Sequence, residues 1–168
     1  MSVAARELPF PIPRGAAIAL TAAAPVAVGG VMAARAGVLA PLAAAPAIVF
    51  GVIAATAPAL YIATAVAGDA PPLSAVARAI GVALCAFGIA LAGLVLPVTF
   101  LSLSSVTDLT TIAACTAALG AAAVIAVMRL ARELQLRTIA ANALFAVWAI
   151  AMLGISARLW WLLGVEVM

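Results

Sequence analysis

Five apolar stretches, each about as long as a membrane-spanning helix, run through nearly the whole chain. They lie at about residues 15–34, 42–67, 79–100, 109–128 and 138–157. A helix needs about 20 predominantly apolar residues to cross a hydrocarbon core roughly 30 Å thick. Within a bilayer a helix also satisfies the polar groups of its own backbone. The sequence therefore predicts an all-α fold, a polytopic transmembrane bundle of five helices that covers residues 15–163.

The scarcity of charge supports lipid as the solvent for most of this chain. Charged residues make up 8% of the sequence, against about 25% in soluble domains. So few charges cannot cover a surface that faces water. The basic residues are all arginine and give a net charge of +3, which in a membrane protein bears on topology. No basic cluster with interleaved aromatic residues predicts binding to nucleic acid.

The two ends of the chain are expected to lie outside the predicted bundle. Residues 1–14 contain Pro9, Pro11 and Pro13, and each proline removes a backbone donor, so we expect an extended, interfacial N-terminus. Residues 158–168 are expected to form an apolar interfacial tail. Trp160 and Trp161 at its start are typical of the aromatic belt at a membrane surface.

The distribution of arginine predicts the orientation of the bundle. Five alternating spans place six arginines on the side of the N-terminus and two, Arg35 and Arg158, on the other. The six are Arg6, Arg14, Arg78, Arg129, Arg132 and Arg137. Since cytoplasmic loops carry the excess of basic residues, the N-terminus is predicted to be cytoplasmic and the C-terminus to lie outside.

Three prolines and one asparagine lie well inside the apolar stretches. Pro25, Pro58 and Pro97 indicate helix kinks or packing points, or alternatively broken helices around a transport site. Asn142 is the most polar side chain inside the fifth stretch. It indicates either a substrate or helix-contact site, or a single hydrogen bond between helices that contributes about 1 kcal/mol.

The sequence lacks the residues that membrane enzymes use for catalysis. It contains no histidine, which excludes a His-based serine protease and a His-Glu-x-x-His zinc site. Asp69 and Asp108 fall in different loops, so they do not form the paired carboxylates of an aspartyl protease. Cys85 and Cys115 lie inside predicted spans, as small apolar side chains. We therefore predict no enzyme activity, no catalytic residues, no metal site and no cofactor.

A basic segment follows the fourth stretch and contains Arg129, Arg132 and Arg137. Juxtamembrane arginines can bind a cytoplasmic partner or anionic lipid, or they can act as a topology determinant alone. Glu133 and Arg137 have the acid-before-base spacing of four residues that stabilises a helix. This segment is expected to extend the helix beyond the membrane before the chain turns.

The middle of the chain resembles bacterial members of the Yip-like superfamily of five-span membrane proteins. The matching residues are Pro58-Ala59-Leu60-Tyr61, the turn at Gly68, Leu73-Ser74, and Leu96-Pro97-Val98-Thr99-Phe100. The family pattern has alanine at the position of Leu96. The resemblance covers about residues 45–130. It implies an integral scaffold or adaptor that works through partners and binds no cofactor, while nothing in these residues identifies a GTPase contact.

These observations favour a non-catalytic subunit that serves as a scaffold or anchor in a larger assembly of the bacterial inner membrane. Its expected partners are membrane lipids and other membrane-protein subunits, or further copies of itself. The alternative is a transporter or channel subunit, which could assemble as a homo-oligomer. A third hypothesis is a protein that shapes the bilayer through spans kinked at Pro25 and Pro58.

Overall fold

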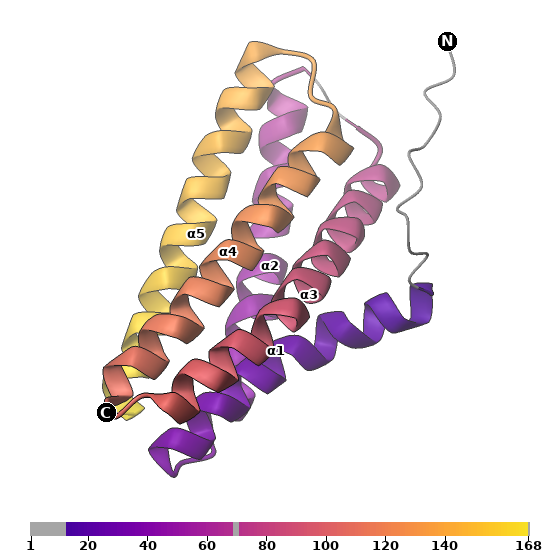
Figure 1. Cartoon of the computed structure of the whole chain (residues 1–168). Helices are drawn as coiled ribbons and strands as arrows, with labels where there is room; N and C mark the ends of the chain where they lie inside the picture. Colours follow the sequence, from indigo (N-terminus) through magenta and orange to yellow (C-terminus); the bar gives the residue numbers. More distant parts are fainter. Residues whose placement is uncertain (1–12, 69–70, 168) are drawn as a thin grey trace.

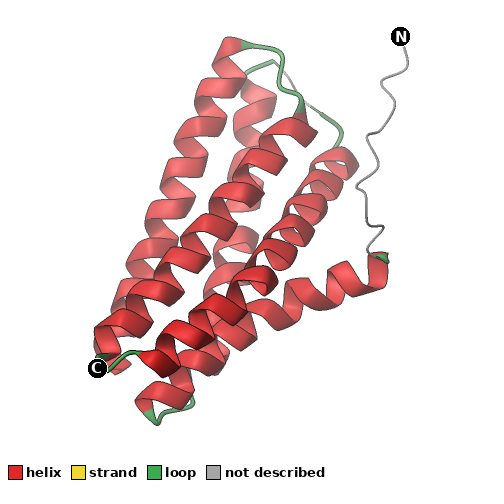
Figure 2. Ribbon diagram, in the orientation of Figure 1, coloured by secondary structure: helices red, strands yellow, loops and turns green. Residues whose placement is uncertain are grey.

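The structure is a computed structural model that describes residues 13–68 and 71–167, and these residues form five long helices. The helices are α1 (Arg14–Ala36), α2 (Ala40–Val66), α3 (Leu73–Ser104), α4 (Asp108–Leu134) and α5 (Ile139–Val167). Figure 2 shows helices joined by short loops, and no strand occurs in the described ranges. All five helices are long and apolar enough to cross a membrane. The prediction of an all-α bundle of five apolar helices is thereby confirmed.

Local backbone chemistry accounts for several helix ends. Pro13 and Pro72 immediately precede α1 and α3, with ψ of 137° and 143°, in an extended conformation that suits proline. Gly37 ends α1 with φ of 70°, and its N–H donates to the carbonyl of Ala33 over 2.9 Å. Glycine takes this left-handed conformation without a Cβ clash. Gln135 at the end of α4 also has a left-handed backbone, with φ of 47°.

The helices extend beyond the apolar stretches that predict them. α3 has 32 residues and begins at Leu73, directly after Pro71 and Pro72. α4 continues past Met128, as predicted, but it ends at Leu134 and leaves Arg137 in the connection that follows. α5 continues through residues 158–167, where the sequence predicts a separate tail, because Arg158 alone does not end a helix. Residues 1–12, 69–70 and 168 lie outside the described residues. Most of the expected extended N-terminus falls among them, and so does Asp69.

Four helices run side by side, and the first lies across them. In Figure 1, α2 to α5 run along the length of the bundle, whereas α1 crosses obliquely with its N-terminal end standing away from the others. The most extensive contacts join α3 with α4 and α2 with α5, and α1 packs against both α3 and α2. The α1–α2 and α3–α4 connections lie at one end of the bundle, and the α2–α3 and α4–α5 connections lie at the other.

Two glycines bring α1 into backbone contact with its neighbours. A Cβ atom on Gly88 of α3 would lie 2.5 Å from the Cα atom of Thr21 on α1, and one on Gly29 of α1 would overlap the carbonyl oxygen of Pro41 on α2. Small residues at such crossings allow close van der Waals packing between membrane helices. α1 therefore bridges the two helix pairs at two tight contacts.

The buried side chains form two separate cores, one toward each end of the bundle. The α1-side core contains residues from α1 and from the parts of the other helices near it: Ala24, Val28, Met32, Ala45, Phe87, Leu91, Val98, Cys115, Ala118, Ala122, Trp160 and Leu163. The far core lies near the α2–α3 and α4–α5 connections and contains Leu60, Val76, Ala79, Ala83, Leu130, Leu134 and Phe145. The two cores hold the helix pairs together at either end.

Candidate functional site

An apolar cavity of about 190 Å³ lies between the α2–α5 pair and the α3–α4 pair. Residues of both cores line it, so it occupies the length of bundle between them. All four of these helices contribute to its wall, which includes Ile48, Ile53, Leu119, Val127 and Met152. α1 contributes none of the lining residues.

The cavity arises because small side chains face one another where the two helix pairs meet. Ala57 of α2, Ala83 of α3, and Ala123 and Ala126 of α4 all lie in its wall. Protein interiors are usually packed to the density of organic crystals. Alanine is too short to fill the space between helices held apart at their ends by larger core residues, so a void remains.

Two tryptophans in the cavity wall are held by hydrogen bonds to neighbouring helices. The Nε1–H group of Trp148 donates to the carbonyl of Thr56 on α2 over 2.9 Å. The Nε1–H group of Trp160 donates to the hydroxyl of Thr116 on α4 over 2.8 Å. Each indole is therefore fixed, and its polar edge is already satisfied.

The hydroxyl groups in the wall are also satisfied within the protein. Thr116 Oγ1 donates to the carbonyl of Ile112 over 2.7 Å, and Ser156 Oγ donates to the carbonyl of Met152 over 2.9 Å. Within residues 13–68 and 71–167, every buried side-chain nitrogen or oxygen has a hydrogen-bond partner. The wall thus presents no unpaired polar atom to a ligand, and its chemistry suits an apolar occupant.

Trp160 does not occupy the interfacial position that the sequence predicts. It is 7% exposed and belongs to the α1-side core, whereas Trp161 is 62% exposed. Consecutive helical residues point about 100° apart, as 3.6 residues make one turn, so the pair cannot share a face. An aromatic anchor at a membrane surface has to be exposed, and of these two residues only Trp161 is.

Asn142 forms local hydrogen bonds where the sequence predicts a contact inside a span. Its Nδ2 atom donates to the carbonyls of Leu136 over 3.2 Å and Thr138 over 2.9 Å. α5 begins at Ile139, so Asn142 stands in the first turn of the helix and is exposed. It closes the α4–α5 connection through local hydrogen bonds in place of the predicted hydrogen bond between spans, and a substrate contact at Asn142 stays a prediction.

The three prolines lie within helices, in two different settings. Pro25 in α1 is fully buried, which fits the predicted packing point. Pro58 in α2 and Pro97 in α3 are exposed. Neither of the exposed pair lines the cavity, so these prolines do not form a broken-helix binding site there.

The basic segment lies at the end of α4 and in the connection that follows. Arg129 pairs with Glu133, with 2.8 Å between Nη2 and Oε1. Arg132 and Arg137 are exposed. The three arginines are thus grouped at one end of the bundle, near the far core. Their contact with a partner or lipid stays a prediction.

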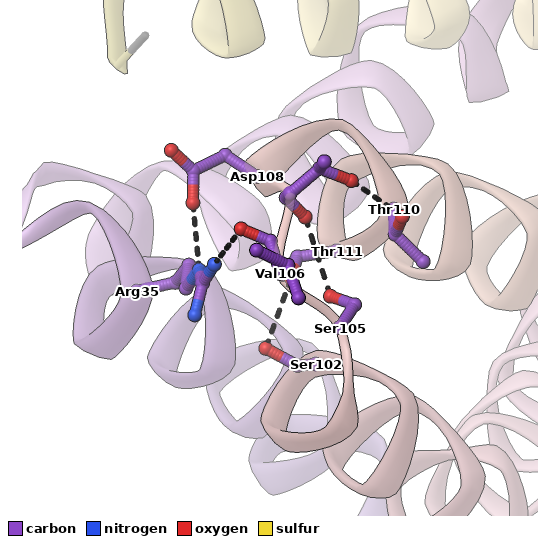
Figure 3. A network of polar contacts seen from close by, with 8 residues as sticks. Arg35, Ser102, Ser105, Val106, Asp108, Thr110 and Thr111 are labelled. Atoms are coloured by element: carbon purple, nitrogen blue, oxygen red, sulfur yellow. Dashed lines mark hydrogen bonds and ion pairs between the residues drawn. The ribbon is translucent and has the colours of Figure 1, made fainter.

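A polar network at the opposite end of the bundle was not predicted from the sequence. Arg35 Nε lies 2.6 Å from Asp108 Oδ1, and its guanidinium also donates to the carbonyl of Val106 over 3.1 Å. Beside them, buried Thr111 donates to Ser102 over 3.1 Å (Figure 3). The predicted alternation of spans places Arg35 and Asp108 on the same side of the membrane, and this was the signal that could have paired them.

Comparisons with known proteins give no relative for this fold. No protein-family model, no curated protein and no solved structure matches the chain. The resemblance to Yip-like proteins therefore stays a prediction. In the part of the chain that the structure describes, no group of three or more His, Cys, Asp or Glu side chains could hold a metal ion. The apolar cavity is the candidate ligand site among the described residues.

Proposed function

We propose that this protein is a non-catalytic integral subunit that acts as a scaffold or anchor within a larger membrane assembly. The supporting observation is the apolar outer surface. Large apolar side chains are exposed on every helix, including Ile18, Ile62, Leu96, Phe100, Val124 and Ile150. The described connections are short, at residues 37–39, 67–68, 71–72, 105–107 and 135–138. Because the described residues have so little surface outside the helices, we expect partners to be met mainly within the bilayer.

The proposed setting is a bacterial inner membrane with the N-terminus in the cytoplasm. Arg78, Arg129, Arg132 and Arg137 belong to the end of the bundle that carries the α2–α3 and α4–α5 connections. The positive-inside rule assigns that end to the cytoplasm. The resemblance to bacterial Yip-like proteins favours the same setting and the same role as a scaffold.

The alternative, a transporter or channel subunit, receives less support from the cavity. Pathways for ions or polar solutes are lined by polar or ionisable side chains or by backbone carbonyls. The wall of this cavity is apolar, and its hydroxyl and indole groups are already hydrogen-bonded. A scaffold role requires no polar path through the bundle.

The proposal is tested by extracting the protein from its native membranes in mild detergent and weighing the intact particle by native mass spectrometry. The proposal predicts other membrane proteins in fixed stoichiometry with this chain. A lone monomer or a closed homo-oligomer would overturn it, and measurement of solute flux in liposomes would then test the transport alternative.

The basic segment provides a sharper version of the same experiment. Changing Arg129→Glu and Arg132→Glu together should release a partner that binds the end of α4 through charge. Arg78→Glu, at the same end of the bundle but on α3, is the matched control. Unchanged co-purification in the double variant would assign Arg129 and Arg132 to topology alone.

A further inference from the structure

We propose that the cavity holds one acyl chain of a membrane phospholipid, which enters sideways between α4 and α5. This inference concerns the inside of the bundle, whereas the scaffold role rests on its outer surface. The two proposals can therefore fail independently.

The chemistry of the wall selects hydrocarbon over water or a polar ligand. Apart from Thr116, Ser156 and the two indoles, the lining residues carry only hydrocarbon side chains, the thioether of Met152, or, at Gly120, no side chain. The polar exceptions make their hydrogen bonds inside the protein. A buried water needs two to four polar partners, and apolar cavities of this size stay dry while binding apolar molecules.

The size and length of the cavity suit one narrow chain. Its volume of about 190 Å³ is below the range of about 300–1,000 Å³ typical of sites for drug-sized ligands. Trp148 and Trp160 both line it, and twelve residues of helix separate them by about 18 Å. The lining therefore extends over about 18 Å of α5, and a volume of about 190 Å³ along this wall fits an extended chain better than a ring system.

The mouth of the cavity is identified by lining residues that are also exposed on the outside of the bundle. These are Thr116 and Gly120 on α4 and Ala157 on α5. Their side chains are small, and a Cβ on Gly120 would meet no other atom within 4 Å. α4 and α5 make far less extensive contact than the α3–α4 or α2–α5 pairs. The opening therefore lies along the seam between α4 and α5.

The depth of the mouth identifies what lies outside it. Thr116 stands eight residues into α4 from Asp108, about 12 Å along the helix axis. α4 has 27 residues, so it is about 40 Å long and exceeds a hydrocarbon core of roughly 30 Å by about 5 Å at each end. The mouth thus opens inside the hydrocarbon layer, where the abundant molecules are the acyl chains of bilayer phospholipids.

Tryptophan fluorescence provides a direct test, because two of the three tryptophans line the cavity. Trp161→Phe removes the exposed third indole and leaves Trp148 and Trp160. This protein is reconstituted into phosphatidylcholine vesicles with or without bromine atoms on the acyl chains. Bromine quenches indole emission on contact, so an acyl chain in the cavity should remove most of the emission of these two enclosed tryptophans.

Variants at the mouth separate a chain in the cavity from lipid around the bundle. Gly120→Ile and Ala157→Phe, made separately, narrow the opening and should restore most of the emission in brominated vesicles. Gly93→Ile is the matched control: Gly93 is also exposed on a helix with open space around it, but it does not line the cavity. It should leave the quenching unchanged. Melting temperatures identify any variant that fails to fold, and the other mouth variant then carries the test.

Three results would overturn the proposal. Quenching that persists equally in folded variants of both mouth positions would place the bromine outside the cavity. Strong quenching by aqueous acrylamide, in place of brominated lipid, would show that water fills the cavity. Quenching by a brominated free fatty acid but not by brominated phosphatidylcholine would assign the cavity to a different ligand.

Discussion

Replacing Gly88 with alanine should loosen the contact between α1 and α3. The added Cβ would lie 2.5 Å from Cα and 2.6 Å from the backbone nitrogen of Thr21, and 2.9 Å from the carbonyl carbon of Leu20. All three are backbone atoms of α1, so no side-chain rotation relieves the overlap. The helices must separate, which also lengthens the 3.3 Å contact from Thr21 Oγ1 to the carbonyl of Leu84, although the single hydroxyl proton has a nearer acceptor in the carbonyl of Ala17 at 2.8 Å.

The expected loss of stability follows from two opposing effects. Forcing an extra carbon into a packed interface destabilises a protein by about 1–3 kcal/mol. Alanine in place of glycine within a helix returns up to about 1 kcal/mol of helix propensity. Gly88→Ala should therefore lower the free energy of unfolding by about 1–3 kcal/mol.

Gly93→Ala and Gly81→Ala are controls on the same helix. A Cβ at either position meets no atom within 4 Å, so both variants should be neutral or up to about 1 kcal/mol more stable. Denaturation of the purified proteins in mixed micelles, followed by tryptophan fluorescence, compares the three. If Gly88→Ala proves as stable as Gly93→Ala, the close crossing of α1 and α3 at Gly88 is refuted.

Two further substitutions test the contacts that join separate helices. Trp148→Phe removes the hydrogen bond to the carbonyl of Thr56 and should destabilise the bundle by about 1 kcal/mol in the same denaturation assay. Asp108→Asn should weaken the exposed pair with Arg35 by at most about 1 kcal/mol, and a double-mutant cycle with Arg35→Gln should show coupling that decreases as salt is added.

The controls for these substitutions lie on the same elements. Trp161→Phe removes an exposed indole of α5 and should leave stability nearly unchanged; an equal loss in both tryptophan variants would contradict the assigned role of Trp148. For the ion pair, a coupling energy of zero at low salt would show that Arg35 and Asp108 do not hold the α1–α2 and α3–α4 connections together.

The number and type of the helices could be predicted from the sequence because they depend on apolar length alone. The continuation of α4 past Met128 was also predictable, since arginines and Glu133 at helical spacing favour a helix outside the membrane. Helix ends were less predictable. Arg158 marks the end of the fifth apolar stretch but not of the helix, because arginine is a good helix former and α5 continues past it.

The packing could not be predicted because these helices are apolar on every side. In a soluble helix the apolar stripe identifies the buried face, but lipid-facing residues here are as apolar as buried ones. Nothing in the sequence therefore distinguishes buried Trp160 from exposed Trp161, or tightly packed Gly88 from open Gly93. The cavity escaped prediction for the same reason, since alanines also occur on the outer surface.

Labelling at the two ends of α4 tests most directly whether this bundle crosses a membrane with its N-terminus in the cytoplasm. Val106→Cys and Ala131→Cys are placed separately in a protein that carries Cys85→Ala and Cys115→Ala; both new positions are exposed. In intact cells, a membrane-impermeant maleimide should react at position 106 and should reach position 131 only after permeabilisation. Reaction at both positions from the same side would contradict the account, because α4 would then not cross the membrane.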